Sequence, residues 1–423
     1  PELERVEIDF ANPYYTTDGQ MIFSDKGRKL EYCPVCKGDH LIIPDHVKDI
    51  GPEAFRGTMY QTIQFPKSYV NVDHRAFDHS RWLEAQGDMA VIGSMLYKAS
   101  CNRSCLNVPP GIRRFRRNLF GYDNTPSKVI SSFLPNRRDM YELNKYDRCR
   151  SFTITSPQAN INIKILSLLD SLEEVHLPDG HKKYKSVDGI VYSQDGRMLV
   201  WYPSSRKSST FTVPDGVKKI GEAAFANQQY LEEIYLPDSV CIVSSRAFMK
   251  CVKLNLVHLS PNIREISDSS AFQSGGVFEG CEKLTHITLP EKLIYLGSFA
   301  FYNSGLTSIQ LNPKLEQMGE YALMAEHLKK VALPPSVKRL GKGSLFYCEE
   351  VKAYEGTAKS LVAAVHTVFP DMKANNMNMK WKRCLVTVLH RRSEKQEHFL
   401  IPGSLKRSAA YHLDMAWNAD FID

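Results

Sequence analysis

Two cysteines three positions apart, Cys33 and Cys36, stand first among the side chains of this sequence that could perform chemistry. The spacing C-x-x-C suits half of a zinc site or a redox pair. No second C-x-x-C and no H-x-x-x-H follows nearby to complete a ligand set. We therefore interpret this pair as buried or incidental thiols, with a metal site as the second reading and a redox pair as the third. The same interpretation applies to Cys101 and Cys105.

Arginine is concentrated in one segment, where ten Lys or Arg and four Asp or Glu lie between Ile112 and Arg150. This segment carries +6, against +7 for the whole chain. Such a patch could contact nucleic acid, a polyanionic glycan or an acidic protein. The reading that we favour is that residues 113–117 are the solvent-facing variable positions of a repeated structural unit. The candidate partner-binding residues are Arg113, Arg114, Arg116, Arg117, Arg137 and Arg138.

No other group of side chains has the spacing of a catalytic or metal site. The 13 histidines and the acidic residues form no cluster, and P-loop, G-x-S-x-G and H-E-x-x-H motifs are absent from the sequence. We therefore expect no enzyme, no catalytic residue, no metal and no cofactor. The hydrophobic fraction of 43% and the charged fraction of 24% are ordinary for a folded soluble protein. No stretch approaches the roughly 20 apolar residues of a membrane span.

The elements that must position these side chains come from a repeat of 22 or 23 residues. Its unit reads L-x-x-I-x-L-P-x-x-V-x-x-I-G-x-x-A-F-x-x-C-x-x. The proline position precedes the phenylalanine position by 11 residues in the copies that contain Pro44, Pro66, Pro109, Pro214, Pro237, Pro290, Asn312 and Pro334. A fixed period of this length predicts a solenoid, in which one coil is too small to bury its own apolar face.

The residue types of the unit predict short parallel strands joined by turns. L-x-x-I-x-L directs apolar side chains inward, and the proline ends strand pairing because it lacks an N–H. We expect the glycine of I-G to supply a positive φ at a corner. The aromatic position should stack from coil to coil, and burial of each ring should contribute about 1.5–3 kcal/mol. Its occupants are Phe55, Phe77, Phe120, Phe225, Phe248, Phe278 and Phe301.

The cysteine position of the unit holds Cys251, Cys281 and Cys348. Stacked coils lie about 5 Å apart, which is within the range that a disulfide spans. Small buried thiols that fill a ladder are nevertheless the interpretation that we favour over a bond between Cys251 and Cys281.

Two segments, 21–34 and 190–203, interrupt the repeat and align with each other without gaps. Each reads as a β-hairpin that turns at Lys26-Gly27 or Asp195-Gly196, and residues 91–98 form a weaker third version. One coil is seven residues longer than its predecessor, which places a Ser/Gly-rich insertion at 268–276. We expect a loop there that bulges from one coil.

The sequence divides into three regions that match the repeat unit to different degrees. Residues 1–172 hold degenerate coils with hairpin insertions, 173–351 hold the regular solenoid, and 352–423 form an α+β cap or the start of a truncated domain. In the last region we expect a helix at 357–368, strands at 384–389 and 398–401 around a polar turn at 391–397, and a helix at 404–417. The chain begins with Pro1 and not Met, so we expect that it was processed or trimmed, and the lack of a leader carries no weight.

The copies between Pro214 and Leu345 resemble the BspA-type leucine-rich repeat, whose unit is close to L-x-x-I-x-I-P-x-x-V-x-x-I-G-x-x-A-F-x-x-C. The chain departs from that unit at Ser260, Asn312, Leu323 and Leu345. The resemblance implies a β-rich leucine-rich-repeat solenoid. Members of this family occur mainly in bacteria, and many are surface or secreted proteins implicated in adhesion. The family brings no catalytic motif.

We therefore expect a binding protein that presents a rigid surface to a protein or glycan, with adhesion at a bacterial cell surface as the function that the resemblance implies. The alternative is an intracellular scaffold that supports a further effector domain, and an enzyme is a distant third. We expect a monomer without a membrane span, and nucleic acid is not an expected partner. The resemblance favours a secreted or cell-surface location over the cytoplasm.

Overall fold

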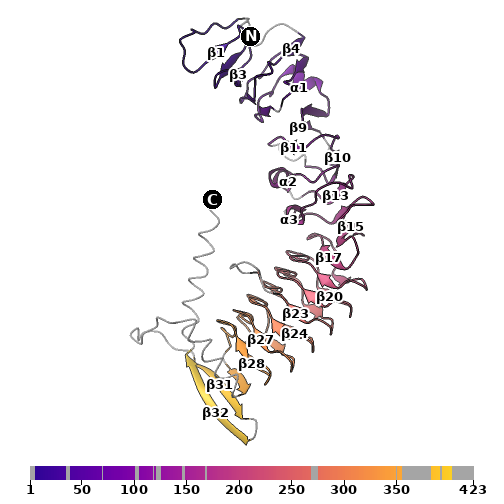
Figure 1. Ribbon diagram of the computed structural model, residues 1–423, viewed down its shortest axis with the longest axis vertical. Helices are drawn as coiled ribbons and strands as arrows, with labels where there is room; N and C mark the ends of the chain where they lie inside the picture. Colours follow the sequence, from indigo (N-terminus) through magenta and orange to yellow (C-terminus); the bar gives the residue numbers. More distant parts are fainter. Residues whose placement is uncertain are drawn as a thin grey trace. The chain divides into compact units, whose positions relative to one another are not determined.

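The computed structural model describes residues 5–34, 39–68, 70–100, 104–117, 119–120, 125–144, 148–166, 169–267, 275–348, 350–354, 383–390 and 393–402. They belong to two compact units, Pro1–His181 and Lys182–Asp423. Each unit is built of β-coils that follow one another in chain order (Figure 1), which confirms the predicted β-rich solenoid. The predicted boundaries after residues 172 and 351 remain a prediction. Among the described residues, no helix has the length and apolarity needed to cross a membrane.

One side of the second unit is a nine-stranded sheet. It begins with an antiparallel hairpin and continues as a parallel ladder with one two-residue strand for each coil. The strands are β15 (Tyr184–Val187), β16 (Ile190–Ser193), β17 (Met198–Trp201), β19 (Lys219–Ile220), β21 (Ile242–Val243), β23 (Glu265–Ile266), β25 (Tyr295–Leu296), β27 (Gln317–Met318) and β29 (Arg339–Leu340). The hairpin β16–β17 confirms the predicted turn at Asp195-Gly196.

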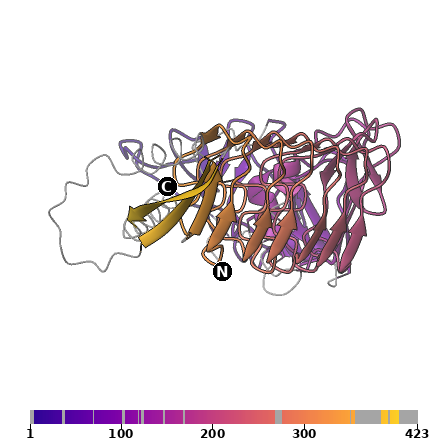
Figure 2. The same ribbon diagram turned by 90° about the horizontal axis from the view of Figure 1, so that it is seen from below.

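The other side of the second unit holds the strands of L-x-x-I-x-L. They pair in parallel as β18 (Thr210–Thr212), β20 (Glu233–Tyr235) and β22 (Leu256–His258), then β24 (His286–Thr288) and β26 (Ser308–Gln310), and finally β28 (Lys330–Ala332) and β30 (Glu350–Tyr354). Figure 2 shows strands of this unit in a row. The central side chain of β20, β22, β24 and β28 is buried and the two beside it point outward, as the alternation of a strand requires.

The first unit repeats this plan with interruptions. One sheet contains β1 (Thr16–Thr17), β2 (Ile22–Ser24), β3 (Lys29–Tyr32), β5 (Asp49–Ile50) and β7 (Asn71–Val72), and a second contains β4 (His40–Ile42) and β6 (Thr62–Gln64). After the helix α1 (Arg81–Ala85), new sheets form from β8 (Met89–Ile92), β9 (Met95–Ala99) and β11 (Arg114–Phe115), and from β10 (Cys105–Asn107), β12 (Lys128–Ser131), β13 (Ser151–Ile154) and β14 (Glu174–His176). The other helices in the described part of this unit are α2 (Arg137–Asn144) and α3 (Ile163–Leu166). The hairpins β2–β3 and β8–β9 confirm the other two predicted hairpins.

The predicted aromatic stack is present in both units. Phe248 lies between Phe225 and Phe278 with ring centroids 5.0 and 5.2 Å apart, and Phe301 continues the stack at 5.2 Å. In the first unit the rings of Phe55 and Phe77 lie 4.7 Å apart with 3° between their planes. All these rings are fully buried. The aromatic position is therefore the centre of one continuous hydrophobic core in each stack of coils.

The cysteine position caps a carbonyl group of the aromatic position. Thr58 and Ser304 donate their hydroxyl to the carbonyl of Phe55 and Phe301 in their own coil. The thiols of Cys251 and Cys281 instead donate to the aromatic residue of the preceding coil, at 3.0 and 3.1 Å. At these four places the side chain is small and donates a hydrogen bond inside the core, whereas the buried Gln228 at the same position after Phe225 donates to the carbonyl of Arg206.

The glycine of I-G does not adopt the positive φ that we expected, so that prediction is wrong. Glycine is required at this position because the coils pack closely: a β-carbon at Gly221 would lie 2.9 Å from the carbonyl oxygen of Leu199. The left-handed positions are two residues before and two residues after the aromatic position, and most of them carry other residue types. Arg246 and Lys250, which flank Phe248, have φ of 58° and 57°.

The C-terminal strands form where the sequence predicts them, as β31 (Arg383–His390) and β32 (Ser393–Pro402), an antiparallel pair that extends the sheet of β28 and β30. The polar turn is shorter than predicted, because β32 already begins at Ser393. The predicted helices at 357–368 and 404–417 lie outside the described residues, as does most of the predicted insertion at 268–276.

Candidate functional site

The six candidate arginines have two different environments. Arg113, Arg117, Arg137 and Arg138 are exposed, the first two beside β11 and the other two at the start of α2. Arg114 and Arg116 are half-buried, and their guanidinium groups donate to the carbonyls of Val70 and His74 at 2.8 and 2.9 Å. Their acceptors are therefore inside the protein, 44 and 42 residues earlier in the chain.

Arg114 replaces a backbone donor that is missing at the end of a sheet. In the preceding coils, the carbonyls of Arg28 and Lys48 accept the backbone N–H of the next coil. Val70 holds the equivalent place, but β7 is the last strand of its sheet. The Nη2 of Arg114 supplies the donor to Val70 in place of a neighbouring strand.

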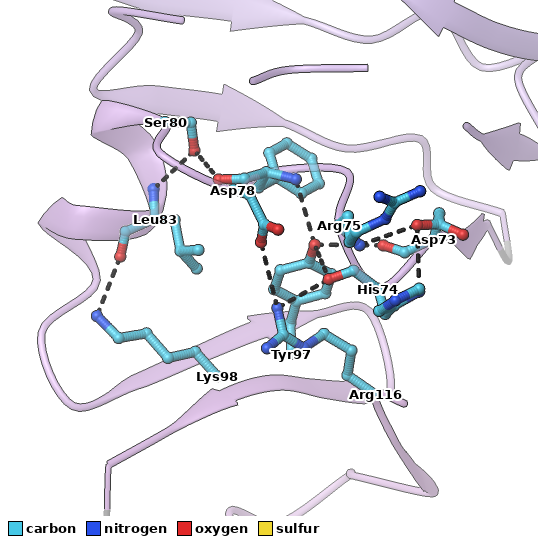
Figure 3. Close-up of polar contacts among 10 residues, drawn as sticks. Asp73, His74, Arg75, Asp78, Ser80, Leu83, Tyr97, Lys98 and Arg116 are labelled. Atoms are coloured by element: carbon cyan, nitrogen blue, oxygen red, sulfur yellow. Dashed lines mark hydrogen bonds and ion pairs between the residues drawn. The ribbon is translucent and has the colours of Figure 1, made fainter. Parts of the chain in front are cut away.

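Tyr97 replaces a missing backbone acceptor at the same place. The amide of Phe55 donates to the carbonyl of Ala76, and the amide of Phe225 donates to that of Ala247, in the next coil. The amide of Phe77 donates instead to the phenol oxygen of Tyr97 at 3.2 Å (Figure 3). The Tyr97 side chain therefore completes a ladder that the backbone leaves open.

Two further contacts hold the Tyr97 phenol in place. Its hydroxyl lies 3.2 and 3.1 Å from the carbonyls of Asp73 and His74, which share it as acceptors. The guanidinium of Arg116 covers the ring at 4.7 Å and also approaches the carboxylate of Asp78 at 4.0 Å. Burial raises the pKa of Tyr97 above its ordinary value, so the phenol stays neutral and keeps its proton for these carbonyls.

The helix α1 packs beside the interrupted ladder. Ser80 caps it by accepting the Leu83 amide at 3.2 Å, and Trp82 is buried against Phe77 at a centroid distance of 4.7 Å. We call the group Tyr97, Arg114 and Arg116 the splice, because it joins the sheets before and after α1. The splice offers no exposed nucleophile or base, and its chemistry is that of a structural hydrogen-bond network.

Sequence reasoning did not find the splice. Its arginines were interpreted only as part of the basic segment, and Tyr97 only as part of the weaker third hairpin. One signal was available, since Tyr97 follows Phe77 by 20 residues where the repeat spacing is 22 or 23. The short spacing together with a tyrosine at the aromatic position indicates that the phenol oxygen takes the place of a backbone carbonyl as hydrogen-bond acceptor.

A second polar cluster, on the outer face of β20 and β22, was also missed. The hydroxyl of Tyr235 donates to Oε1 of Glu233 at 2.6 Å, and Nε2 of His258 lies 2.9 Å from the same oxygen. The rings of Tyr235 and His258 stack at 4.1 Å with 4° between their planes. The Tyr235 hydrogen bond and then the His258 contact hold the pKa of Glu233 below its ordinary value, and the bond to Glu233 raises the pKa of Tyr235. These residues occupy variable positions, where the repeat unit gives no signal.

The cysteine pairs of the sequence analysis are only partly described. Cys33 is buried, Cys105 is half-buried, and Cys36 and Cys101 lie outside the described residues. Cys251 and Cys281 are thiols buried in the core, and burial together with the neighbouring Cys251 raises the pKa of Cys281. Within the ranges that the structure describes, no three His, Cys, Asp or Glu side chains are grouped as a metal site would require.

Comparison with known proteins places the repeat in a family. The profile of the BspA type leucine rich repeat region matches six copies over residues 32–134, 202–276 and 273–363, more than half of the chain. No curated protein matches the sequence significantly.

Three solved structures illustrate the likeness. A leucine rich cell surface protein from Faecalibacterium prausnitzii is 17% identical, and the match covers 84% of this chain and 98% of that protein, with a TM-score of 0.39. A leucine-rich repeat protein from Bacteroides ovatus is 14% identical, and the match covers 83% of this chain and 96% of that protein, with a TM-score of 0.37. The pneumococcal vaccine antigen PcpA is 17% identical, and the match covers 84% of this chain and 85% of that protein, with a TM-score of 0.36.

Proposed function

The chain belongs to the BspA-type leucine-rich repeat family, and from that premise we propose that it is a non-enzymatic binding protein that presents a rigid surface to a protein or glycan. One observation carries this proposal: the aromatic residues stack as a fully buried ladder, so the outward side chains of successive coils are held at fixed spacings. A preordered surface loses little conformational entropy when a partner binds. Adhesion at a bacterial cell surface is the setting that fits the family.

A capture experiment tests this function. The full chain, immobilised, is offered extracellular-matrix proteins and cell-surface extracts, and retained molecules are titrated against the free chain by interferometry. We expect at least one protein or glycan that binds saturably with a single affinity. Absence of any saturable ligand would overturn the proposal, and so would turnover of a captured molecule. A partner found only in the cytoplasm would favour the scaffold alternative.

We propose further that the exposed arginines Arg113, Arg117, Arg137 and Arg138 are the part of the basic segment that contacts an acidic partner. Substitution of these four by serine should lower the salt concentration at which the chain leaves a heparin column, because each lost contact with a sulfate or carboxylate group of heparin weakens a salt-dependent attraction. The measurement is the elution position at constant pH. Equal elution of both proteins would reject this patch.

The design separates binding from folding. Substitution of Arg114 or Arg116 would also remove the hydrogen bonds to Val70 and His74, so a loss of retention in such a variant would be ambiguous. The matched control replaces four exposed lysines outside the segment, Lys218, Lys253, Lys283 and Lys292, by serine. This control removes the same net charge, so a specific patch requires that it alters elution less.

A further inference from the structure

Six outward side chains of the second unit form a regular grid on three neighbouring strands. The register of β18, β20 and β22 places Thr210 beside Glu233 and Glu233 beside Leu256, in one row. The second row is Thr212, Tyr235 and His258. Neighbouring strands lie about 4.8 Å apart, so the six side chains are within reach of one small ligand. We call this surface the grid.

The grid is accessible and already ordered. Tyr235 is 39% exposed, Leu256 is 44% exposed and the His258 side chain is 44% exposed. Glu233 Oε1 accepts from Tyr235 at 2.6 Å and faces Nε2 of His258 at 2.9 Å, so the three side chains hold one another in place. A ligand that binds here would find its contacts preorganised, which lowers the entropy cost of association.

The hydrogen-bonding groups that the grid still offers are mainly acceptors. The Nε2 of His258 faces a carboxylate, which favours the tautomer of the neutral imidazole with its proton on Nε2 and its Nδ1 as an acceptor. The second oxygen of the Glu233 carboxylate and the lone pairs of the Tyr235 hydroxyl are further acceptors. A fitting ligand must consequently bring several donors.

Charge distinguishes between the possible donors. Glu233 is the one carboxylate of the grid, which contains no lysine or arginine, so an anionic ligand would be repelled at contact. The whole chain carries +7, which opposes the approach of a cationic ligand. A neutral ligand rich in hydroxyl groups satisfies both conditions. The threonine hydroxyls of β18 add donors and acceptors at one side of the same surface.

We propose that the grid is a binding site for a neutral carbohydrate, an inference that rests on the proposed binding function and names the ligand class for one site. Sugar hydroxyls donate to Glu233 and to Nδ1 of His258. The C–H face of the sugar packs on the face of the Tyr235 ring opposite to the stacked His258, beside Thr212, as aromatic side chains bind apolar surface.

The test uses the full chain and defined probes. Neutral glucan, mannan and galactan oligosaccharides are screened on an array together with heparin oligosaccharides and poly-lysine, and the strongest neutral ligand is titrated by calorimetry. We expect saturable binding of at least one neutral oligosaccharide. Tyr235→Ala and Glu233→Gln should each weaken it at least tenfold. The matched control Ile294→Ala, which alters a residue that is 50% exposed beside β25, should leave it unchanged.

Each other outcome contradicts the inference. Binding of poly-lysine that is lost in Glu233→Gln would identify a cationic ligand instead. Neutral binding that survives both grid substitutions would place the site elsewhere. If the capture experiment finds a saturable protein partner and no neutral oligosaccharide binds, the inference fails and the proposed function stands, whereas absence of any ligand rejects both. Thermal unfolding of each variant verifies that the exposed substitutions preserve the fold.

Discussion

Phe248→Ala is expected to lower the free energy of unfolding by about 3–5 kcal/mol, the range for removal of a buried aromatic ring from a packed core. Phe248 is fully buried between Phe225 and Phe278, at centroid distances of 5.0 and 5.2 Å. The alanine would leave a cavity that spans the contact between two coils, and each neighbouring ring would lose one stacking partner. Urea unfolding monitored by circular dichroism measures the change.

An exposed aromatic residue provides the control for this prediction. Tyr235→Ala removes a ring of similar size from the surface of the same coil, where 39% of the residue is exposed. Its effect should stay below about 1 kcal/mol, because surface substitutions usually change stability by about 0.5 kcal/mol and this one also removes an exposed hydrogen bond to Glu233. Similar losses for both variants would show that the aromatic ladder is not a main source of stability.

Tyr97→Phe is expected to cost about 1–3 kcal/mol, although it removes a single oxygen atom. The reason is that the buried amide of Phe77 would lose its acceptor, and an unsatisfied buried donor carries its full desolvation penalty. The loss should be local. Hydrogen exchange measured by mass spectrometry should quicken in peptides that contain residues 70–80, next to the open edge of β7.

Tyr202→Phe is the matched control, because Tyr202 stacks on Phe225 in the second unit and its buried hydroxyl, which has Ser208 and Arg206 as its polar neighbours, accepts from no described backbone amide of the aromatic ladder. This variant should cost clearly less than Tyr97→Phe, since no buried backbone amide loses its acceptor. If Tyr97→Phe behaved in the same way, the phenol oxygen would not act as a replacement for the backbone carbonyl.

The sequence alone was sufficient for the parts of the fold that repeat. A residue that recurs in each coil meets its own copies in neighbouring coils, so periodicity alone identifies the buried aromatic position and the strands around it. Phe225, Phe248 and Phe301 were predictable for this reason, and so were the hairpins with a glycine at the turn.

The rest was not predictable, because it depends on single departures from the period. Tyr97, Arg114 and Arg116 act where a strand is missing, and no repeated pattern marks a missing strand. The role of Gly221 was misread because a close approach between backbones and a left-handed φ both favour glycine. Glu233 and His258 meet across two coils, and outward positions carry no periodic constraint.

Hydrogen bonding around the long coil follows the pattern of the coils of ordinary length. The amide of Phe248 donates to Val277 and that of Phe278 donates to Ala300, at 2.9 and 2.8 Å, on either side of the extra residues. The strands β21, β23 and β25 also pair without a shift through the same coil. A coil can therefore gain residues between two of its strands while those strands and its aromatic position keep their register, so that a change in coil length leaves the shared interior undisturbed.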